Sequence, residues 1–222
     1  MKRLALALLV VAGGAQAAAP QMRLSANPSA VVAAEIAFNR LAQEKGQWTA
    51  FRATAAKDAV MFVPEMVNAQ LWLKGRKDPP ASVKWQPEKV LMSCDGSVGV
   101  TSGAWQRPDG SNGYFTTIWR RDDRGRWNWV FDHGDVLKAP RPAPDFITTR
   151  LASCPRGMRP PPAPSTGVKP LPPTPGIGAS EDGSLKWTSE VRPDKSRRVT
   201  VSLRVNDAFE TALTDDVAAP AS

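Results

Sequence analysis

Three titratable side chains in the middle of this chain could transfer a proton. His133 is the only histidine among the 222 residues and directly follows Asp132, and Asp58 is a third candidate. Histidine titrates near neutral pH, and a carboxyl group in an apolar pocket can have a raised pKa and act as a base. Each can equally be structural, with the histidine holding a strand end and a carboxylate accepting a backbone N–H. We therefore treat His133, Asp132 and Asp58 as candidate catalytic residues, with His133 and Asp132 on opposite faces of one strand.

Large aromatic side chains near these groups could bind an apolar ligand. Trp127, Trp129 and Phe131 alternate along the same segment as His133. This spacing predicts that all four lie on one face, which we expect to be the buried side of a sheet. With Tyr114, the only tyrosine, the three aromatic residues are the predicted ligand-binding residues. The alternative is that they only pack, in the core or under a second layer formed by the C-terminal strands or another subunit.

The chain has two cysteines, Cys94 and Cys154. In an oxidising compartment an even pair favours a disulfide, whereas two thiols and one histidine make a poor zinc site. Motifs typical of zinc proteases, esterases and nucleotide-binding loops do not occur in the sequence. We therefore predict a disulfide between Cys94 and Cys154, no metal and no cofactor.

The first residues have the pattern of a cleavable signal peptide. Lys2 and Arg3 precede a short apolar run, and Ala15-Gln16-Ala17 provides a small-residue cleavage site. The run is shorter than the roughly 20 residues that cross a bilayer, and no later segment is apolar enough to do so. We therefore expect export to the periplasm or the extracellular space, and a mature chain without a transmembrane segment.

The formal net charge of +8 is spread along the chain, and basic residues are interleaved with acidic ones. A protein that binds nucleic acid concentrates its basic side chains on one face or helix. Nucleic acid is therefore not expected as a partner.

The patterns along the chain predict helices first and strands afterwards. Asn27-Pro28 indicates a helix start and Gly46 a helix end, and a second short helix contains Trp48 and Phe51. Strands bounded by turn residues are predicted at 59–63, 84–93, 98–106, 114–121 and 127–133, with a short helix at 67–73. This order predicts an α+β fold, in which a cone-shaped, curved antiparallel sheet packs on the N-terminal helices.

Composition divides the chain into successive parts. Prolines are concentrated after the predicted sheet, as is typical of a stiff linker, and apolar residues alternate again near the C-terminus. The C-terminal meander is too small to bury a core alone, so we expect it to pack on the main domain or on another copy of the chain. The predicted parts are a signal peptide (1–17), a leader (18–28), the main domain (29–137), a Pro-rich linker (138–178), a small β-meander (179–217) and a tail (218–222).

Three short stretches carry a resemblance to a known family: Glu35–Asn39, Asp58–Phe62 and Gly125–Gly134. In their order and spacing the main domain resembles the DUF4440 branch of the nuclear transport factor 2-like (NTF2-like) superfamily, which includes SnoaL-like and ketosteroid-isomerase-like proteins. The resemblance implies a cone with a pocket open at one end. It also implies either isomerase, cyclase or dehydratase activity, or a binding module without chemistry. Ketosteroid isomerases pair an acid with a tyrosine in the pocket, and Tyr114 is the one tyrosine available here.

Two functions follow from these observations. The first is an exported domain that binds a small apolar ligand or a partner subunit, such as a second copy in a homodimer, in or on its cone. The alternative is an enzyme of the isomerase, dehydratase or cyclase type that uses His133 with Asp132 or Asp58. The two are separated by whether His133 and a carboxylate converge inside one cavity.

Overall fold

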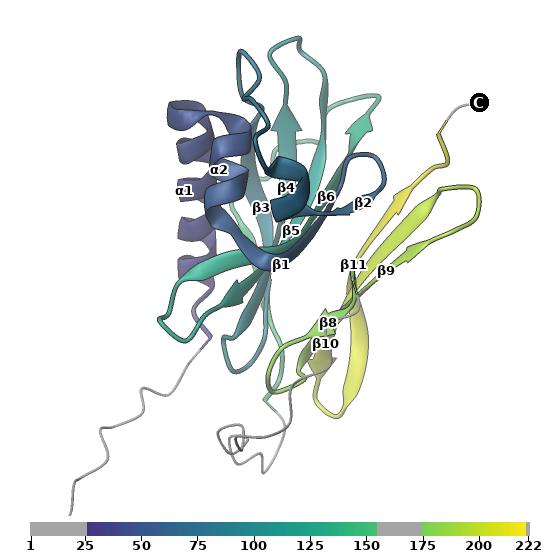
Figure 1. The fold of residues 1–222 in the computed structure, drawn as a ribbon. Coiled ribbons are helices and arrows are strands. Elements are labelled where there is room, and N and C mark those ends of the chain that lie inside the picture. The colour runs from purple at the N-terminus through teal and green to yellow at the C-terminus, as the bar shows by residue number, and fades with distance from the viewer. Residues whose placement is uncertain (1–25, 155–174, 221–222) are drawn as a thin grey trace, which may run out of the picture.

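A computed structural model of the chain describes residues 26–154 and 175–220. Its α+β architecture confirms the predicted fold class: N-terminal helices pack on a curved sheet, and a separate antiparallel sheet follows (Figure 1). The predicted signal peptide, most of the leader, the central part of the Pro-rich linker and the end of the tail lie outside the described residues. Among the helices that are described, none has the length and apolar character needed to cross a membrane.

Two consecutive helices form one layer of the fold. α1 (Pro28–Lys45) begins at Asn27, whose side-chain oxygen accepts a hydrogen bond from the Ala30 amide at 3.3 Å. It ends at Gly46, where a φ of 105° favours glycine. α2 (Gln47–Thr54) follows directly. The buried residues of α1 are Val31, Glu35, Phe38 and Ala42.

The main sheet contains seven strands within the described residues. They are β1 (Ala55–Phe62), β2 (Met66–Asn68), β3 (Lys84–Met92), β4 (Val98–Gln106), β5 (Asn112–Arg121), β6 (Trp127–Leu137) and β7 (Thr148–Leu151). Their spatial order is β2-β1-β6-β5-β4-β3-β7, with β3 to β6 joined in succession by tight turns, as the turn residues predicted. A short helix, α3 (Ala69–Leu73), connects β2 to the segment before β3.

This sheet is mixed, which corrects the prediction of an antiparallel sheet. β1 pairs with β6 in parallel, and β7 pairs with β3 in parallel. Turn residues identify hairpins between successive strands, but parallel neighbours need longer connections whose course is set by packing. β7 also lies inside the range 138–178 predicted as a linker, so that range contributes a strand to the main sheet.

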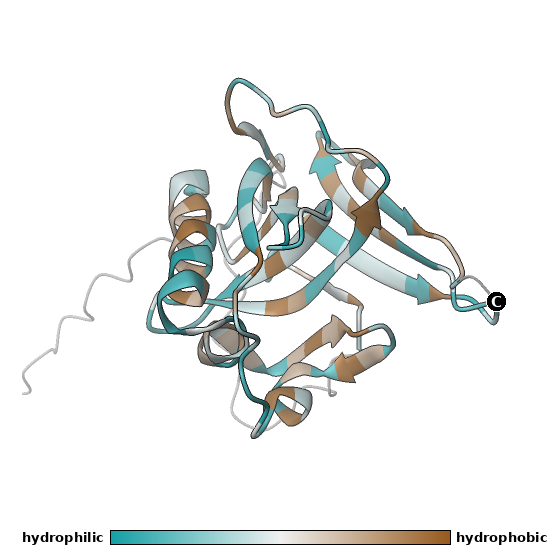
Figure 2. Ribbon diagram, turned by 90° about the horizontal axis from the view of Figure 1, so that it is seen from above, coloured by the Kyte–Doolittle hydropathy of each residue, from teal (hydrophilic) through white to brown (hydrophobic). Residues whose placement is uncertain are grey.

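A second sheet packs on the convex face of the main sheet. It is an antiparallel meander of β8 (Gly178–Ala179), β9 (Leu185–Val191), β10 (Arg197–Val205) and β11 (Ala208–Val217). Figures 1 and 2 show it on the side of the main sheet opposite to α1 and α2. The apolar cluster between the two sheets includes Leu91, Val100, Ile118 and Phe131 of the main sheet and Leu185, Trp187, Val201 and Leu203 of the second. Helices therefore cover the concave face and the C-terminal meander covers the convex face.

Candidate functional site

The concave face of the main sheet and the helices α1 and α2 form an open pocket of about 230 Å³. Five aromatic side chains line it: Phe38 of α1, Phe51 of α2, and Trp85, Trp105 and Phe115 of the sheet. These rings offer a ligand an apolar surface, as is usual in small-molecule sites. The other lining residues are Gln47, Val83, Arg107, Thr117, Asp132, His133, Gly134, Asp135 and Val136.

The register of β4, β5 and β6 places the residues of the concave face in rows across the three strands. These rows follow one another from the interior of the cone to its mouth. The deep row is Thr101, Thr117 and Asp132; the middle row is Gly103, Phe115 and Gly134; the mouth row is Trp105, Gly113 and Val136. The deep and mouth rows are four residues apart along each strand, which corresponds to about 13 Å at the usual rise of a strand. The pocket therefore has a carboxyl group at its deep end and a tryptophan at its mouth.

Asp132 is the carboxyl group at the deep end. Its Oδ2 accepts a hydrogen bond from the Thr117 hydroxyl at 2.8 Å. Burial raises the pKa of Asp132 to about 7, the bond from Thr117 acts in the opposite direction, and the nearby charge of Glu35 adds to the rise. Both protonation states of Asp132 are therefore populated near neutral pH, which is the condition for accepting and returning a proton.

Glu35 lies deeper still and is fully buried. Its carboxyl oxygens accept hydrogen bonds from the indole N–H groups of Trp85 at 2.6 Å and Trp119 at 2.9 Å, and from the Thr101 hydroxyl. Burial raises the pKa of Glu35, while these three hydrogen bonds act to lower it. Because Glu35 does not line the pocket, its role is to fasten α1 to three strands of the sheet.

The aromatic residues of β6 do not share one face, contrary to the prediction. The adjacent residues Ile118 and Trp119 of β5 pair with Phe131 and Trp129, so one residue of β6 between them is left without a partner. This bulge shifts the alternation by one position. Trp127 and Trp129 therefore pack with the helices, and Phe131 packs beneath the second sheet.

The ring of His133 lies on the convex face, which corrects the expectation that it lines the cone. The residue is 2% exposed, and its Nε2 is 3.1 Å from Oδ2 of Asp215 on β11. The same oxygen accepts a hydrogen bond from the Thr116 hydroxyl at 2.7 Å. Burial lowers the pKa of His133, and the hydrogen bond with Asp215 opposes this effect. The sheet separates this ring from Asp132, so the two side chains do not converge.

Asp58 and Tyr114 also lie outside the pocket. Asp58 forms an ion pair with Arg120 through two hydrogen bonds of 2.7 and 3.0 Å. Tyr114 alternates with the pocket residue Phe115 and therefore faces the second sheet, where its ring centroid is 6.0 Å from that of His133. Among the predicted site residues, Asp132 is the one whose side chain faces the pocket.

Most of the residues that line the pocket were not among the predicted site residues. Phe38 and Phe51 were part of the predicted helices, and Trp85 and Trp105 fall on predicted strands, so their burial was expected. Their convergence depends on strand register and on the angle at which the helices cross the sheet. Arg107 carried no signal, because it belongs to a turn whose pattern, Arg-Pro-Asp-Gly-Ser, indicates only a chain reversal.

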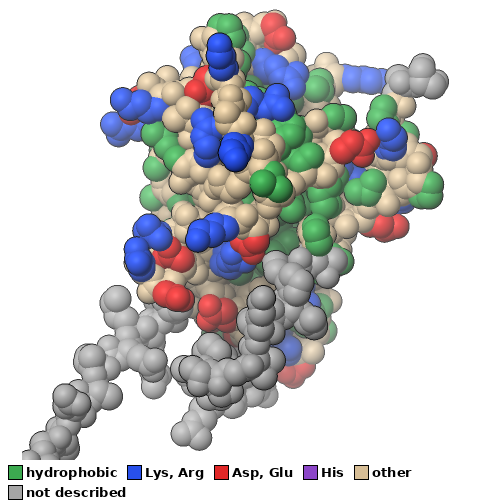
Figure 3. Space-filling model, in the orientation of Figure 1, with side chains coloured by type: hydrophobic (Ala, Val, Ile, Leu, Met, Phe, Trp, Pro, Cys, Tyr) green, Lys and Arg blue, Asp and Glu red, His purple; other side chains and the backbone are tan. Residues whose placement is uncertain are grey.

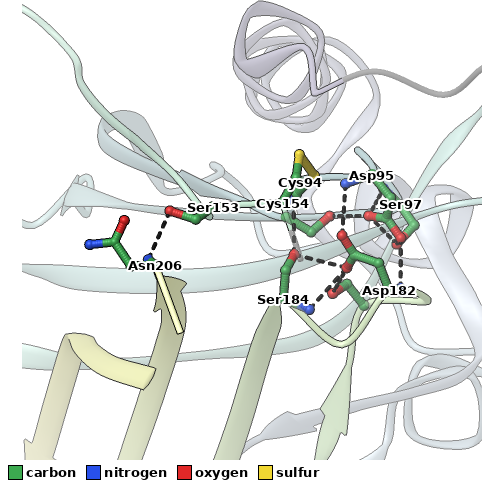
Figure 4. The surroundings of a disulfide bond; sticks show 10 residues. Cys94, Asp95, Ser97, Ser153, Cys154, Asp182, Ser184 and Asn206 are labelled. Atoms are coloured by element: carbon green, nitrogen blue, oxygen red, sulfur yellow. Dashed lines mark hydrogen bonds between the residues drawn. A yellow bond between two sulfur atoms is a disulfide. The ribbon is translucent and has the colours of Figure 1, made fainter. Parts of the chain in front are cut away.

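The predicted disulfide joins Cys94 to Cys154 (Figure 4). It connects the turn after β3 to the segment that follows β7. Within residues 26–154 and 175–220, no group of three or more His, Cys, Asp or Glu side chains is arranged to hold a metal ion.

No protein-family model matches the chain, and no curated protein is similar to it. A candidate ketosteroid isomerase from Parabacteroides distasonis is 16% identical, with 53% of this chain and 98% of that protein covered and a TM-score of 0.41. An NTF2-like protein of unknown function from Shewanella baltica is 9% identical over 49% of this chain and 92% of its own, with a TM-score of 0.37. An NTF2-like protein of unknown function from Pseudomonas aeruginosa is 20% identical over 48% and 94%, with a TM-score of 0.35. At these TM-scores the similarity does not assign the chain to a family or a function. Membership of the DUF4440 branch stays a proposal.

Proposed function

We propose that this chain is an exported small-molecule-binding protein of the NTF2-like type, whose ligand occupies the cone between Asp132 and the mouth row. The observation that supports this most is the combination of an open pocket of about 230 Å³, an aromatic wall and one carboxyl group at its deep end. Apolar pockets with few convergent polar groups are the usual form of small-molecule sites. Export belongs to the same proposal, since an oxidising compartment would preserve the disulfide between Cys94 and Cys154.

The volume of the pocket limits the size of the ligand. A cavity of about 150 Å³ is known to hold benzene. The pocket of about 230 Å³ would therefore accept a substituted single ring or two fused rings. The partner subunit considered from the sequence has less support, because the chain's own second sheet already covers the convex face.

Calorimetric titration with naphthalene-2-carboxamide, a neutral two-ring probe, tests this proposal. Val136 lies in the mouth row and is 51% exposed, so Val136→Trp should fold and obstruct the opening. We expect the native chain to bind the probe and Val136→Trp to weaken binding at least tenfold. The matched control is Val191→Trp on β9, where the side chain is 44% exposed and does not line the pocket. Absence of binding by the native chain, both of this probe and of the corresponding carboxylate, or equal binding of the probe by Val136→Trp, would overturn the proposal.

A second candidate function is proton transfer at a carbon next to a carbonyl group. It is favoured by Asp132, whose pKa of about 7 and position in the pocket suit a general base. In this reaction Asp132 would take a proton from the carbon and return it to the same or a neighbouring carbon. The test is exchange of the α-hydrogens of 2-tetralone with deuterium, followed by NMR in D₂O. We expect faster exchange with the native chain than with Asp132→Asn, and equal rates would remove this candidate.

A further inference from the structure

Arg107 stands at the mouth of the pocket on a turn with a fixed backbone. The turn joins β4 to β5, and its ends are closed by the hydrogen bond from the Arg107 amide to the Ser111 carbonyl at 2.8 Å. Asp109 caps the turn by accepting the Ser111 amide, also at 2.8 Å. The side chain of Arg107 is exposed and lines the pocket. A charged group is therefore held at the opening by a rigid support.

The guanidinium group of Arg107 lies over the ring of Trp105, 4.6 Å from its centroid. Trp105 is itself fixed, because its indole N–H donates to the Tyr114 carbonyl at 2.8 Å. The ring also lies against Gly113, where a Cβ atom would overlap it. Stacking uses the face of a guanidinium and leaves its N–H donors free at the edge. The tryptophan therefore orients Arg107 without occupying its hydrogen-bonding groups.

Arg107 is not used in an ion pair within the described part of the chain. Asp109 is near enough for their charges to interact, but its carboxylate is already bonded to Ser111. A second donor group is close by on the pocket wall. Gln47 accepts the Val83 amide through Oε1 at 3.1 Å, and its NH₂ group has no acceptor among the described residues. Asp135, which also lines the pocket, accepts the Val136 amide at 2.8 Å through Oδ1 and forms no ion pair with Arg107. Arg107 and Gln47 therefore keep hydrogen-bond donors for a ligand.

The surface around Arg107 is also positively charged. The segment between α3 and β3 carries Lys74, Arg76 and Lys77 against the single acid Asp78, and Lys84 begins β3. Figure 3 shows lysine and arginine side chains gathered at the end of the molecule where this segment and the β4–β5 turn lie in Figure 1. A positive rim raises the local concentration of anions and their rate of entry.

Resting on the proposed function, we infer that the ligand is a one- or two-ring organic acid whose anionic group binds Arg107 at the mouth. The apolar rings would lie between Phe38, Phe51 and Phe115, all of which line the pocket. A carboxylate matches the planar pair of N–H groups on a guanidinium. At the mouth it would also be about four strand residues, roughly 13 Å, from the row of Asp132, so the two acidic groups would not oppose one another.

The test compares naphthalene-2-carboxylate with naphthalene-2-carboxamide, which have the same rings and differ in charge. Calorimetric titration at low salt should show that the native chain binds the carboxylate about tenfold more tightly, the difference expected for one charge-assisted interaction of about 1.4 kcal/mol. Arg107→Gln should abolish this preference and leave carboxamide binding unchanged. The matched control is Arg124→Gln, the same charge change on the β5–β6 turn at the opposite end of the sheet, and it should keep the preference.

The outcomes separate this inference from the function on which it rests. Binding of both probes with equal affinity by the native chain would overturn the inference alone. A preference that persists in Arg107→Gln would do the same, because the anion would then bind elsewhere. Binding of neither probe would overturn the proposed function and the inference with it.

Discussion

Asp132 combines a buried setting with direct access to the pocket, and this makes its charge sensitive to pH. Its pKa is raised to about 7 by burial and by Glu35, while Thr117 stabilises the charged form. The other charged groups that line the pocket are Arg107 and Asp135. Asp132 is therefore the group through which pH should influence both stability and ligand binding.

We predict that Asp132→Asn stabilises the chain at alkaline pH. The folded state holds a proton on Asp132 up to about pH 7, whereas the unfolded chain releases it near pH 4. The native chain therefore loses stability as pH rises from about 4 to 7, relative to the variant, and the difference is constant above that range. Urea denaturation at pH 5 and pH 8 should show a variant more stable at pH 8 by about 2–4 kcal/mol, the size set by the shift in pKa. Asp207→Asn on an exposed turn is the control, and an equal effect there would contradict the prediction.

His133 links the second sheet to the main sheet, and its ring lies on the face opposite to the pocket. Its ring bonds to Asp215 across the interface at 3.1 Å, and Asp215 also bonds to Thr116. We predict that His133→Ala lowers the free energy of unfolding by about 2–3 kcal/mol, because it leaves a cavity and removes a partner from a buried carboxylate. Affinity for the neutral naphthalene probe should stay within twofold of the native value. A loss of binding with unchanged stability would place His133 in the ligand site.

At the scale of elements, two similar turns lock the sheets together. The turns at 93–97 and 180–184 both have the pattern Ser-x-Asp-Gly-Ser. They meet in a two-fold arrangement (Figure 4), in which the Asp95 amide donates to Asp182 at 3.0 Å and the Asp182 amide donates to Asp95 at 2.9 Å. The amide before each aspartate donates to the last serine of the opposite turn, at 2.9 and 3.0 Å. The glycine in each turn has a positive φ, 72° and 66°, which the tight reversal requires.

We predict that Asp182→Ala costs about 3 kcal/mol of stability, since it removes charge-assisted hydrogen bonds and leaves the Asp95 amide unpaired. Asp194→Ala is a matched control, because Asp194 caps the β9–β10 turn through Ser196 and is bonded within its own turn. It should cost about 1 kcal/mol. Urea denaturation provides both values. In the double variant Asp95→Ala/Asp182→Ala the cost should be smaller than the sum of the single costs, because the two side chains belong to one network in which each accepts the backbone amide of the other residue. Strict additivity would argue against the coupled arrangement.

At the scale of the whole molecule, the C-terminal sheet is a structural layer of the cone. Leu185, Val199, Val201 and Leu203 are fully buried against the main sheet. An apolar face of this kind is stable in water only when it is covered. Cys94 and Cys154 both precede the sheet in the chain, so the disulfide does not tether it, and packing and hydrogen bonds hold it in place.

We predict that the C-terminal sheet stays bound after the chain is cut. A protease site inserted between residues 160 and 170 would separate residues 175–222 from the rest without breaking the disulfide. After cleavage, size-exclusion chromatography should show both fragments in one peak, and Leu203→Asp should release the smaller fragment by placing a charge in the interface. The uncut Leu203→Asp chain tests whether the variant folds. Dissociation of the native fragments after cleavage would contradict this account.

Local chemistry in the sequence was sufficient for several features. The ends of α1 at Asn27 and Gly46 follow from capping and from the conformational freedom of glycine, and the hairpins follow from their turn residues. The pairing of Cys94 with Cys154 followed because no other cysteine exists. The helix ends and the hairpins depend only on residues that are neighbours in the sequence. The disulfide had only one possible pairing.

Only the tertiary structure decided which side chains meet in the pocket. One unpaired residue in β6 places Phe131 and His133 under the second sheet, and period-two spacing cannot reveal it because a bulge is an irregularity in pairing with β5. The parallel pairing of β1 with β6 likewise brings together strands that are distant in the sequence. Three consecutive apolar residues, Trp129-Val130-Phe131, break the alternation in the sequence at the bulge, and all three are buried in the structure. The sequence determined which segments form helices and strands and where their apolar residues lie. Long-range packing determined which face of each element became the site, because the burial of a face depends on the elements that pack against it.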